Sequence, residues 1–201
     1  METIIRSPTY TINLGNGAVL TLWNDFIHDD AAATLLDALL DQIKWQQPHV
    51  NIFGHEHPIP RLQYWMGDPE AKYCYSGLML KPNSWHSSVQ TLREQISATT
   101  QHDFNATLIN LYRDGTDKMG WHSDDERELG PSPWIASFNL GSKRTFALRK
   151  QGTTRIQEQI ELQHNQLLLM SPAVQHGWQH CVPQRKRIKQ PRINMTFRRI
   201  F

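Results

Sequence analysis

The chemistry that this sequence indicates most directly is metal chelation by two histidines and one carboxylate. His122 and Asp124 stand two residues apart after a polar turn, RDGTDKMG, so an extended backbone would direct both side chains to the same side. A later histidine, His180, could complete a facial set of ligands. Such a set leaves three positions of an octahedral iron(II) ion open, enough for a bidentate keto acid and dioxygen.

The His-x-Asp pair is weak evidence by itself. With 10 histidines and 19 acidic residues in 201 positions, about one such match is expected by chance. His28-Asp29-Asp30 is another match, and we interpret it as the start of a helix that one of the aspartates caps. His176 competes with His180 for the third ligand position, but its spacing from the arginines downstream suits the role less well.

A strand with alternating character follows His180 and offers a partner for an anion. In residues 192–198 (RINMTFR) polar and apolar residues alternate, which places two guanidiniums on one face. Alone, this pattern favours an edge strand with its polar face in solvent; a polar lumen that holds an anion is the alternative. A bidentate arginine suits the distal carboxylate of 2-oxoglutarate, and Asn110 and Tyr112 on the strand before His122 could add hydrogen bonds.

The periodicity of the chain changes near its middle. Helical spacing of apolar residues occurs at 30–45 and 88–99, in each case behind residues suited to N-capping, and we expect helices in the first half only. After Phe104, period-two segments bounded by turn residues predict strands at about 105–112, 134–140, 144–149, 155–162, 166–170, 175–182 and 191–200.

These segments predict a mainly β fold with flanking helices (α+β). Many short strands without helical crossovers favour a double-sheet jelly roll, or double-stranded β-helix, over about 104–200, with the helices outside and a cover at about 50–80. No repeat or long linker divides the chain, so we expect one domain over 1–201.

Composition limits the remaining function classes. The 39% apolar and 20% charged content is ordinary for a soluble protein, no apolar run approaches the ~20 residues of a membrane span, and no secretory signal is recognisable. We expect a monomer in the cytoplasm, or in the nucleus if the source is eukaryotic. Cys74 and Cys181 have no CxxC partner, which argues against a disulfide framework. The basic run at 184–189 (QRKRIK) suits a solvated loop as well as a phosphate contact.

Taken together, the motifs resemble the AlkB family of DNA/RNA repair dioxygenases, particularly the branch of the animal homologues 2 and 3. The resembling segments, within about residues 50–200, are 110–115 (NLYRDG), 121–126 (WHSDDE), 135–141 (IASFNLG), 178–180 (WQH) and 191–198 (PRINMTFR). The resemblance implies an enzyme that uses Fe(2+), 2-oxoglutarate and O2. It would hydroxylate the N-methyl group of 1-methyladenine or 3-methylcytosine in DNA, and also in RNA for some members, with release of formaldehyde, succinate and CO2.

The resemblance also implies roles for individual residues. His122, Asp124 and His180 would bind the iron. A larger set would hold 2-oxoglutarate, with Arg192 on its distal carboxylate: Asn110, Tyr112, Arg192, Asn194, Thr196 and Arg198.

A flipped base would need a pocket that stacks and hydrogen-bonds it. By resemblance, Tyr75, with Tyr73 beside it, would stack the base against the first iron ligand, and Asp125 and Glu126 would favour a cationic methylated base. Phe53, next to Gly54, falls at the position of an apolar wedge that replaces the flipped base in duplex DNA. The flank HEH at 55–57 lacks the expected basic residues, and the segment that begins at Arg61 is closer to a single-strand-preferring relative, so strand preference stays open.

Two further hypotheses remain from the sequence. One is a 2-oxoglutarate oxygenase that acts on a protein, a lipid or a small molecule. The other is a non-catalytic barrel that binds nucleic acid, which the intact ligand set disfavours.

Overall fold

Strands dominate the structure, a computed structural model that describes residues 6–52, 54–71, 73–75 and 78–201. The strands of the larger sheet are β1 (Tyr10–Gly15), β2 (Ala18–Trp23), β5 (Leu62–Gly67), β8 (Ala106–Tyr112), β10 (Ile135–Gly141), β13 (Gln166–Met170) and β15 (Arg192–Arg198). Those of the smaller sheet are β9 (Met119–His122), β11 (Arg144–Lys150), β12 (Glu158–Leu162) and β14 (Trp178–Val182). Two short hairpins are formed by β3 (His49–Ile52) with β4 (His55–Pro58) and by β6 (Tyr73–Tyr75) with β7 (Leu78–Leu80).

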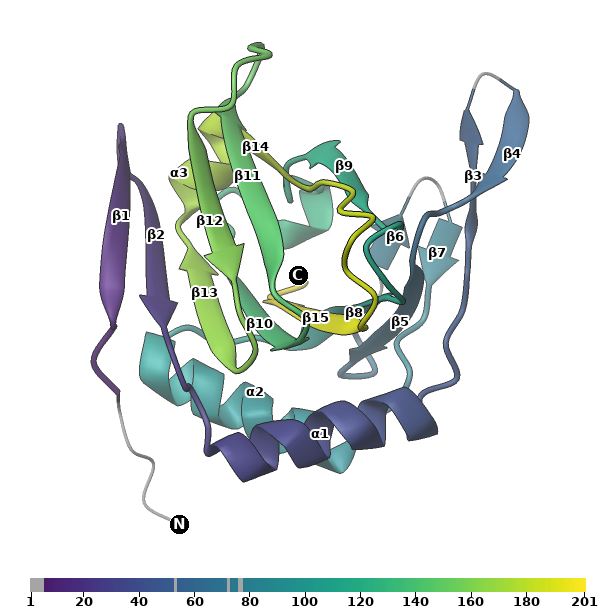
Figure 1. The fold of residues 1–201 in the computed structure, drawn as a ribbon. Coiled ribbons are helices and arrows are strands. Elements are labelled where there is room, and N and C mark those ends of the chain that lie inside the picture. Colours follow the sequence, from purple (N-terminus) through teal and green to yellow (C-terminus); the bar gives the residue numbers. More distant parts are fainter. Residues whose placement is uncertain (1–5, 53, 72, 76–77) are drawn as a thin grey trace.

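Two antiparallel sheets face each other in a jelly roll (Figure 1). Within the described residues the larger sheet has the order β1-β2-β13-β10-β15-β8-β5 and the smaller one the order β12-β11-β14-β9. Helices α1 (Asp29–Gln42) and α2 (Ser87–Thr100) cover the face of the larger sheet that points away from the smaller sheet. The predicted mainly β fold with flanking helices is confirmed.

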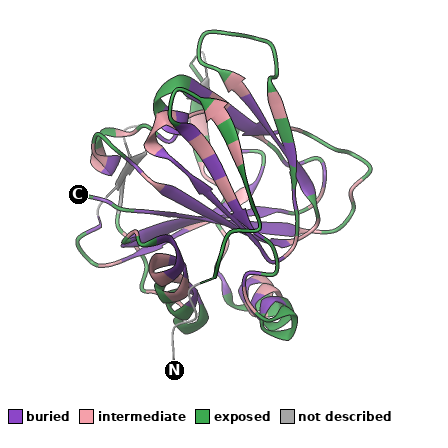
Figure 2. Cartoon of the chain, turned by 90° about the vertical axis from the view of Figure 1, so that its left-hand side faces the viewer, coloured by how far each residue is buried: buried purple, intermediate pink, exposed green. Residues whose placement is uncertain are grey.

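The central strands of the larger sheet, β13, β10, β15 and β8, are buried on both faces because they alternate two kinds of apolar contact. Residues such as Leu108 and Leu168 pack between the sheets, whereas Ile109 and Phe138 pack against the helices. Figure 2 shows this burial along the strands, with exposed residues on the outward faces of the helices. None of the helices in the described residues is both long and apolar enough to span a membrane.

The central position of β15 settles the question that its alternation left open. It pairs with β10 on one side and β8 on the other, and all its residues are buried. The edge-strand interpretation is therefore wrong. Ile193, Met195 and Phe197 face the helices, so the two arginines face the space between the sheets.

Several predicted elements differ from the observed ones. The segment predicted as a strand at 175–182 begins as helix α3 (Pro172–Gly177), so helices are not confined to the first half. Strand β5 belongs to the larger sheet although its residues were assigned to the cover, because all its residues pair with β8, from Ala106 to Leu111. The β1-β2 hairpin was not predicted.

The predicted helix caps are also wrong. His28 and His86 occupy the N-cap positions of α1 and α2, and neither helix has a side-chain capping hydrogen bond. Asp29 and Asp30 lie in the first turn instead, where a negative charge interacts favourably with the helix dipole.

Candidate metal and co-substrate site

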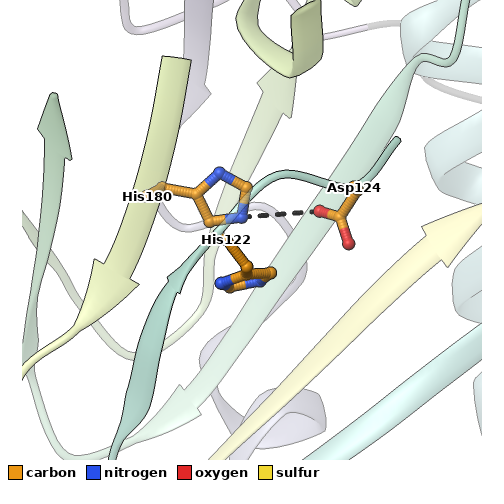
Figure 3. A group of neighbouring side chains, drawn as sticks. All are labelled: His122, Asp124 and His180. Carbon is orange, nitrogen blue, oxygen red and sulfur yellow. Dashed lines mark ion pairs between the residues drawn. The ribbon is translucent and has the colours of Figure 1, made fainter. Parts of the chain in front are cut away.

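Two imidazoles and one carboxylate meet between the sheets. The candidate ligand atoms of His122, Asp124 and His180 all lie within 4.8 Å of one another, and His180 Nε2 is 3.5 Å from Asp124 Oδ2 (Figure 3). Within the described residues, no other group of three or more His, Cys, Asp or Glu side chains is so arranged. Two nitrogens and a carboxylate on one side of a common point suit a divalent transition metal.

Strand pairing places the two histidines. His122 ends β9 and pairs directly with His180 on β14, so both side chains point to the same face and their ring centroids are 4.3 Å apart. Phe146 of β11 stacks on the His180 ring at 5.0 Å. Of the His-x-Asp pair, His122 is the last residue of β9, and Asp124 lies two residues beyond the end of this strand.

The hydrogen bond of His122 fixes which nitrogen is free. Its Nδ1 lies 2.9 Å from the carbonyl oxygen of Gly120, so an N–H at Nδ1 donates to that carbonyl and Nε2 keeps its lone pair. Burial, together with the nearby His180, lowers the pKa of His122 to about 4. The ring is therefore neutral at neutral pH, which is the form that binds metals.

Asp124 is ionised despite its burial. Burial alone would raise the pKa of this carboxyl, but the Arg198 guanidinium, 3.0 Å away, and His180 outweigh it and hold the pKa below its ordinary value. The carboxylate is therefore available as a ligand throughout the neutral range.

Gln175 of α3 holds the backbone of the carboxylate residue. Its Oε1 accepts a hydrogen bond from the Asp124 N–H at 3.0 Å, and its Nε2 donates to the Met170 sulfur at 3.7 Å. The side chain is fully buried. Because α3 was predicted as a strand, nothing in the sequence indicated this role.

Replacing Gln175 by methionine should weaken metal binding. The change keeps the shape of the side chain but leaves the Asp124 N–H without its acceptor, and losses of this kind cost about 10- to 100-fold in metal affinity. Titration with Mn(II), followed by electron paramagnetic resonance, measures the Kd. Gln159→Met, an exposed position on β12, is the matched control. A Kd for Gln175→Met equal to that of the control would contradict the role.

A cavity of about 250 Å³ opens beside the three side chains. Its lining includes all six side chains expected to hold 2-oxoglutarate: Asn110, Tyr112, Arg192, Asn194, Thr196 and Arg198. The strands β8 and β15 contribute these groups side by side, since Asn110 pairs with Asn194 and Tyr112 with Arg192. The apolar remainder of the lining includes Leu108, Met170 and Val182.

Arg192 is the cation at the end of β15 opposite to Arg198, which contacts Asp124. It is 1% exposed, its Nη2 donates to Asn139 Oδ1, and its guanidinium lies over the Tyr112 ring at 5.0 Å. Its Nε and Nη1 have no hydrogen-bond partner among the described residues. Burial lowers the pKa of Arg192 to about 10, so the group stays cationic at neutral pH with two donors unused. An anion fits there.

The other expected site residues are placed differently. Glu126 lines the cavity, whereas Asp125 is exposed and does not. Arg61 is buried behind the lining, where its Nε donates to Asn110 Oδ1 at 2.8 Å. Gly54 is exposed at the tip of the β3-β4 hairpin, with a φ of +82°.

Three expected substrate residues fall outside what the structure describes in full. Phe53 lies outside the described residues. For Tyr73 and Tyr75, the structure describes only the backbone, in strand β6.

The competing histidines lie elsewhere. His176 is exposed, with its Nε2 2.9 Å from the Pro131 carbonyl oxygen, and His28 is exposed at the start of α1. Neither belongs to the group of His122, Asp124 and His180.

Comparison with known proteins bears on the same residues. The family model of the 2OG-Fe(II) oxygenase superfamily matches residues 19–198, which include the three candidate ligands and all of β15. The chain belongs to this superfamily.

Within the 2OG-Fe(II) oxygenase superfamily the chain belongs to the AlkB family. It is 37% identical to human alpha-ketoglutarate-dependent dioxygenase alkB homolog 3 over 100% of this chain and 73% of that protein. It is 40% identical to mouse DNA oxidative demethylase ALKBH2 over 75% of this chain and 66% of that protein. The solved structure of OsALKBH1 has a TM-score of 0.64 at 16% identity, covers 94% of this chain and 100% of its own, and thus shares the fold.

As an AlkB-family member, the protein is an Fe(2+)- and 2-oxoglutarate-dependent dioxygenase that consumes O2. The residues present fit both groups: a donor set of two imidazole nitrogens and one carboxylate for the metal, and a buried guanidinium with two unused donors for the dicarboxylate.

Proposed function

We propose that the protein is an oxidative demethylase of N-alkylated bases in nucleic acid, with 1-methyladenine and 3-methylcytosine in DNA as substrates and RNA as a further one. The observation that carries this is the convergence of His122, Asp124 and His180 beside a cavity whose lining also includes two arginines and Glu126. The names of the relatives, a DNA oxidative demethylase among them, support the substrate class.

The three converging side chains are proposed as the iron ligands. His122 binds through Nε2, because its Nδ1 faces the Gly120 carbonyl. His180 presents Nε2 toward Asp124, and Asp124 presents Oδ2. Arg198 stays on the other carboxylate oxygen, so that Asp124 has one oxygen for the metal and one for the guanidinium.

The cavity wall from β8 and β15 is proposed to hold 2-oxoglutarate. Arg192 would donate hydrogen bonds from its Nε and Nη1 to the distal carboxylate, and the keto-acid end would point toward the three metal ligands. Asn110, Asn194 and Thr196 line the path between these ends and orient the molecule. When bound, these groups would supply the oxidation that hydroxylates the N-methyl carbon, with conversion of 2-oxoglutarate to succinate and CO2. The hydroxymethyl group would then leave as formaldehyde and restore the base.

The base itself is proposed to enter between His122 and the β6-β7 hairpin. Tyr75 on β6, with Tyr73 two residues before it, stacks the base, and Glu126 at the cavity edge balances the charge of a cationic methylated ring. Asp125, exposed beside Glu126, contributes to the same field from outside the cavity. Arg61 acts from behind the wall, through Asn110.

The direct test is formaldehyde release from oligonucleotides that contain 1-methyladenine or 3-methylcytosine. Single-stranded DNA, duplex DNA and RNA are each incubated with Fe(2+), 2-oxoglutarate and air, and omission of each component in turn is the control. Repair that requires all three components is expected. Succinate formation without any repair of these oligonucleotides would instead favour a protein, lipid or small-molecule substrate.

Phe53 is proposed as the wedge that occupies the gap left by a flipped base in a duplex. Its neighbour Gly54 is exposed at the tip of the β3-β4 hairpin. Phe53→Ala should reduce repair of duplex DNA more than repair of single strands, because only the duplex needs the gap filled. Parallel time courses on both substrates measure the ratio, and an equal loss on both would refute the wedge.

The basic loop at 184–189 is proposed to bind the phosphate backbone. Arg185, Lys186 and Arg187 are exposed, while the backbone of the loop is held against Gly115. Replacing the three by glutamine should flatten the dependence of log K on log salt by about 0.9 for each duplex phosphate that is no longer neutralised. Fluorescence anisotropy between 50 and 200 mM salt, roughly the range in which such charges matter, measures the slope. Lys44→Gln, an exposed cation after α1, should leave the slope unchanged.

We also propose an oligomeric state, a domain organisation and a cellular location for the enzyme. We propose a monomer with one domain over 1–201, in which the hairpins at about 50–80 form a nucleotide-recognition lid over the 104–200 core. The enzyme would work in the cytoplasm, or in the nucleus of a eukaryotic cell.

A further inference from the structure

Arg144 is a buried arginine that does not line the cavity. It stands at the start of β11 and is 1% exposed. Its guanidinium donates to three backbone carbonyls, at 3.1 Å to Asp114, 2.7 Å to Asp117 and 2.9 Å to Pro183. A buried cation needs such partners, because removal from water is costly. The three carbonyls come from two separate loops, so one side chain ties the loops together.

The two loops that Arg144 joins also contact each other closely. Loop 113–118 follows β8, and loop 183–191 precedes β15. The Arg185 N–H donates to the Gly115 carbonyl at 2.7 Å, and the Gly115 N–H donates to the Ile188 carbonyl at 2.9 Å. A Cβ at Gly115 would lie 1.7 Å from the Arg185 carbonyl oxygen, so only glycine permits this approach.

Arg144 also contacts the aromatic ring beside the candidate co-substrate cation. Its guanidinium carbon lies 5.3 Å from the centroid of the Tyr112 ring, and that of Arg192 lies 5.0 Å from the same centroid. Tyr112 ends β8 and Arg192 begins β15, so each adjoins one of the two tied loops. The ring and Asn139 are the contacts that hold the Arg192 guanidinium in place.

From these contacts we propose that Arg144 is a positioning residue for the 2-oxoglutarate carboxylate: by tying loops 113–118 and 183–191 and packing on Tyr112, it fixes the direction of Arg192. The proposal rests on the assignment of Arg192 made above, and does not depend on which substrate is demethylated.

The metal ligands should be much less sensitive to Arg144. His122 and His180 are held by the pairing of β9 with β14, and Asp124 by Gln175. Tyr112 and Arg192 instead lie at the strand ends that adjoin the tied loops. Loss of Arg144 should therefore separate co-substrate affinity from metal affinity.

The test measures 2-oxoglutarate binding to the Mn(II)-loaded protein by isothermal titration calorimetry. Arg144→Lys and Arg144→Met are each expected to raise the Kd for 2-oxoglutarate about tenfold, while the Kd for Mn(II) stays within twofold. Lysine keeps the charge but lacks the planar fork that reaches three carbonyls. In turnover assays the KM for 2-oxoglutarate should rise in proportion, with kcat at saturating 2-oxoglutarate within about threefold of the wild type.

Two further variants make the outcome decisive. Lys143→Met removes the neighbouring exposed cation and should leave 2-oxoglutarate binding unchanged. Gly115→Ala keeps every charge but forces the loops apart, and should raise the Kd for 2-oxoglutarate as the Arg144 variants do. If Arg144→Met fails to fold, Arg144→Lys and Gly115→Ala decide. A wild-type Kd for 2-oxoglutarate in a folded Arg144→Lys protein, or an equal loss of Mn(II) and 2-oxoglutarate affinity, would overturn the proposal.

Discussion

Replacing His122 or His180 by alanine is expected to weaken iron binding about 100-fold and to abolish turnover. Each change removes one of three converging donors. Structural zinc sites with four protein ligands have apparent metal-binding free energies of about 10–16 kcal/mol. Each ligand therefore contributes roughly 3 kcal/mol, or about 100-fold in metal affinity. The Kd for Mn(II) and formaldehyde release from a methylated oligonucleotide measure the two effects on the same protein.

His176→Ala is the matched control for this prediction. It removes a histidine four residues before His180 that is exposed and lies beside the Pro131 carbonyl instead of the other ligands. Metal affinity should be that of the wild type. If His176→Ala lost the metal while His180→Ala kept it, the assignment of the third ligand would have to be reversed.

Replacing Arg192 by methionine is expected to remove most of the affinity for 2-oxoglutarate while sparing the metal. The guanidinium is buried and has two unused donors, so a bound carboxylate would lose its principal partner. Truncating one side of a buried, hydrogen-bonded charge pair costs about 2–5 kcal/mol, which is about 30-fold or more in Kd. Arg192→Lys should recover only part of this loss, because a lysine presents a point charge in place of a fork.

Calorimetry with 2-oxoglutarate on the Mn(II)-loaded variants gives the measurement. Arg199→Met is the control, since Arg199 follows Arg198 directly but is exposed and paired with Asp103 on the surface. Unchanged 2-oxoglutarate affinity in Arg192→Met would show that the carboxylate binds elsewhere, and would also remove the basis of the role proposed for Arg144.

Local patterns were enough to predict much of the fold. The apolar periodicity at 30–45 and 88–99 corresponds to α1 and α2, and the period-two segments after Phe104 correspond to strands of both sheets. The error at 175–182 arose because Trp178 to Val182 do form a strand, and the short helix before it has too few turns to show a helical period.

The surroundings of β15 could not be predicted from its own residues. Its alternation favoured solvent-facing positions for Arg192 and Arg198, since a polar face on an isolated strand is most often exposed. They are buried because non-local pairing inserts β15 between β8 and β10, and because Asp124 and Asn139 provide partners from distant positions. The sequence offered a polar lumen as the alternative, and the family resemblance favoured it.

The residues that support the site were likewise beyond the reach of the sequence. Gln175 and Arg144 belong to no short motif, and each acts through backbone groups that are distant along the chain. Such roles depend on tertiary contacts, which neither composition nor periodicity encodes.

The arrangement of the larger sheet also has a consequence for synthesis on the ribosome. β15 is made after every other strand of that sheet, yet it fills the gap between β8 and β10. Until it emerges, those two strands present unpaired backbone edges, which are prone to associate with other chains. The nascent protein would therefore gain Arg192 and lose these exposed edges in the same event, so we expect chains that lack β15 to be inactive and prone to associate.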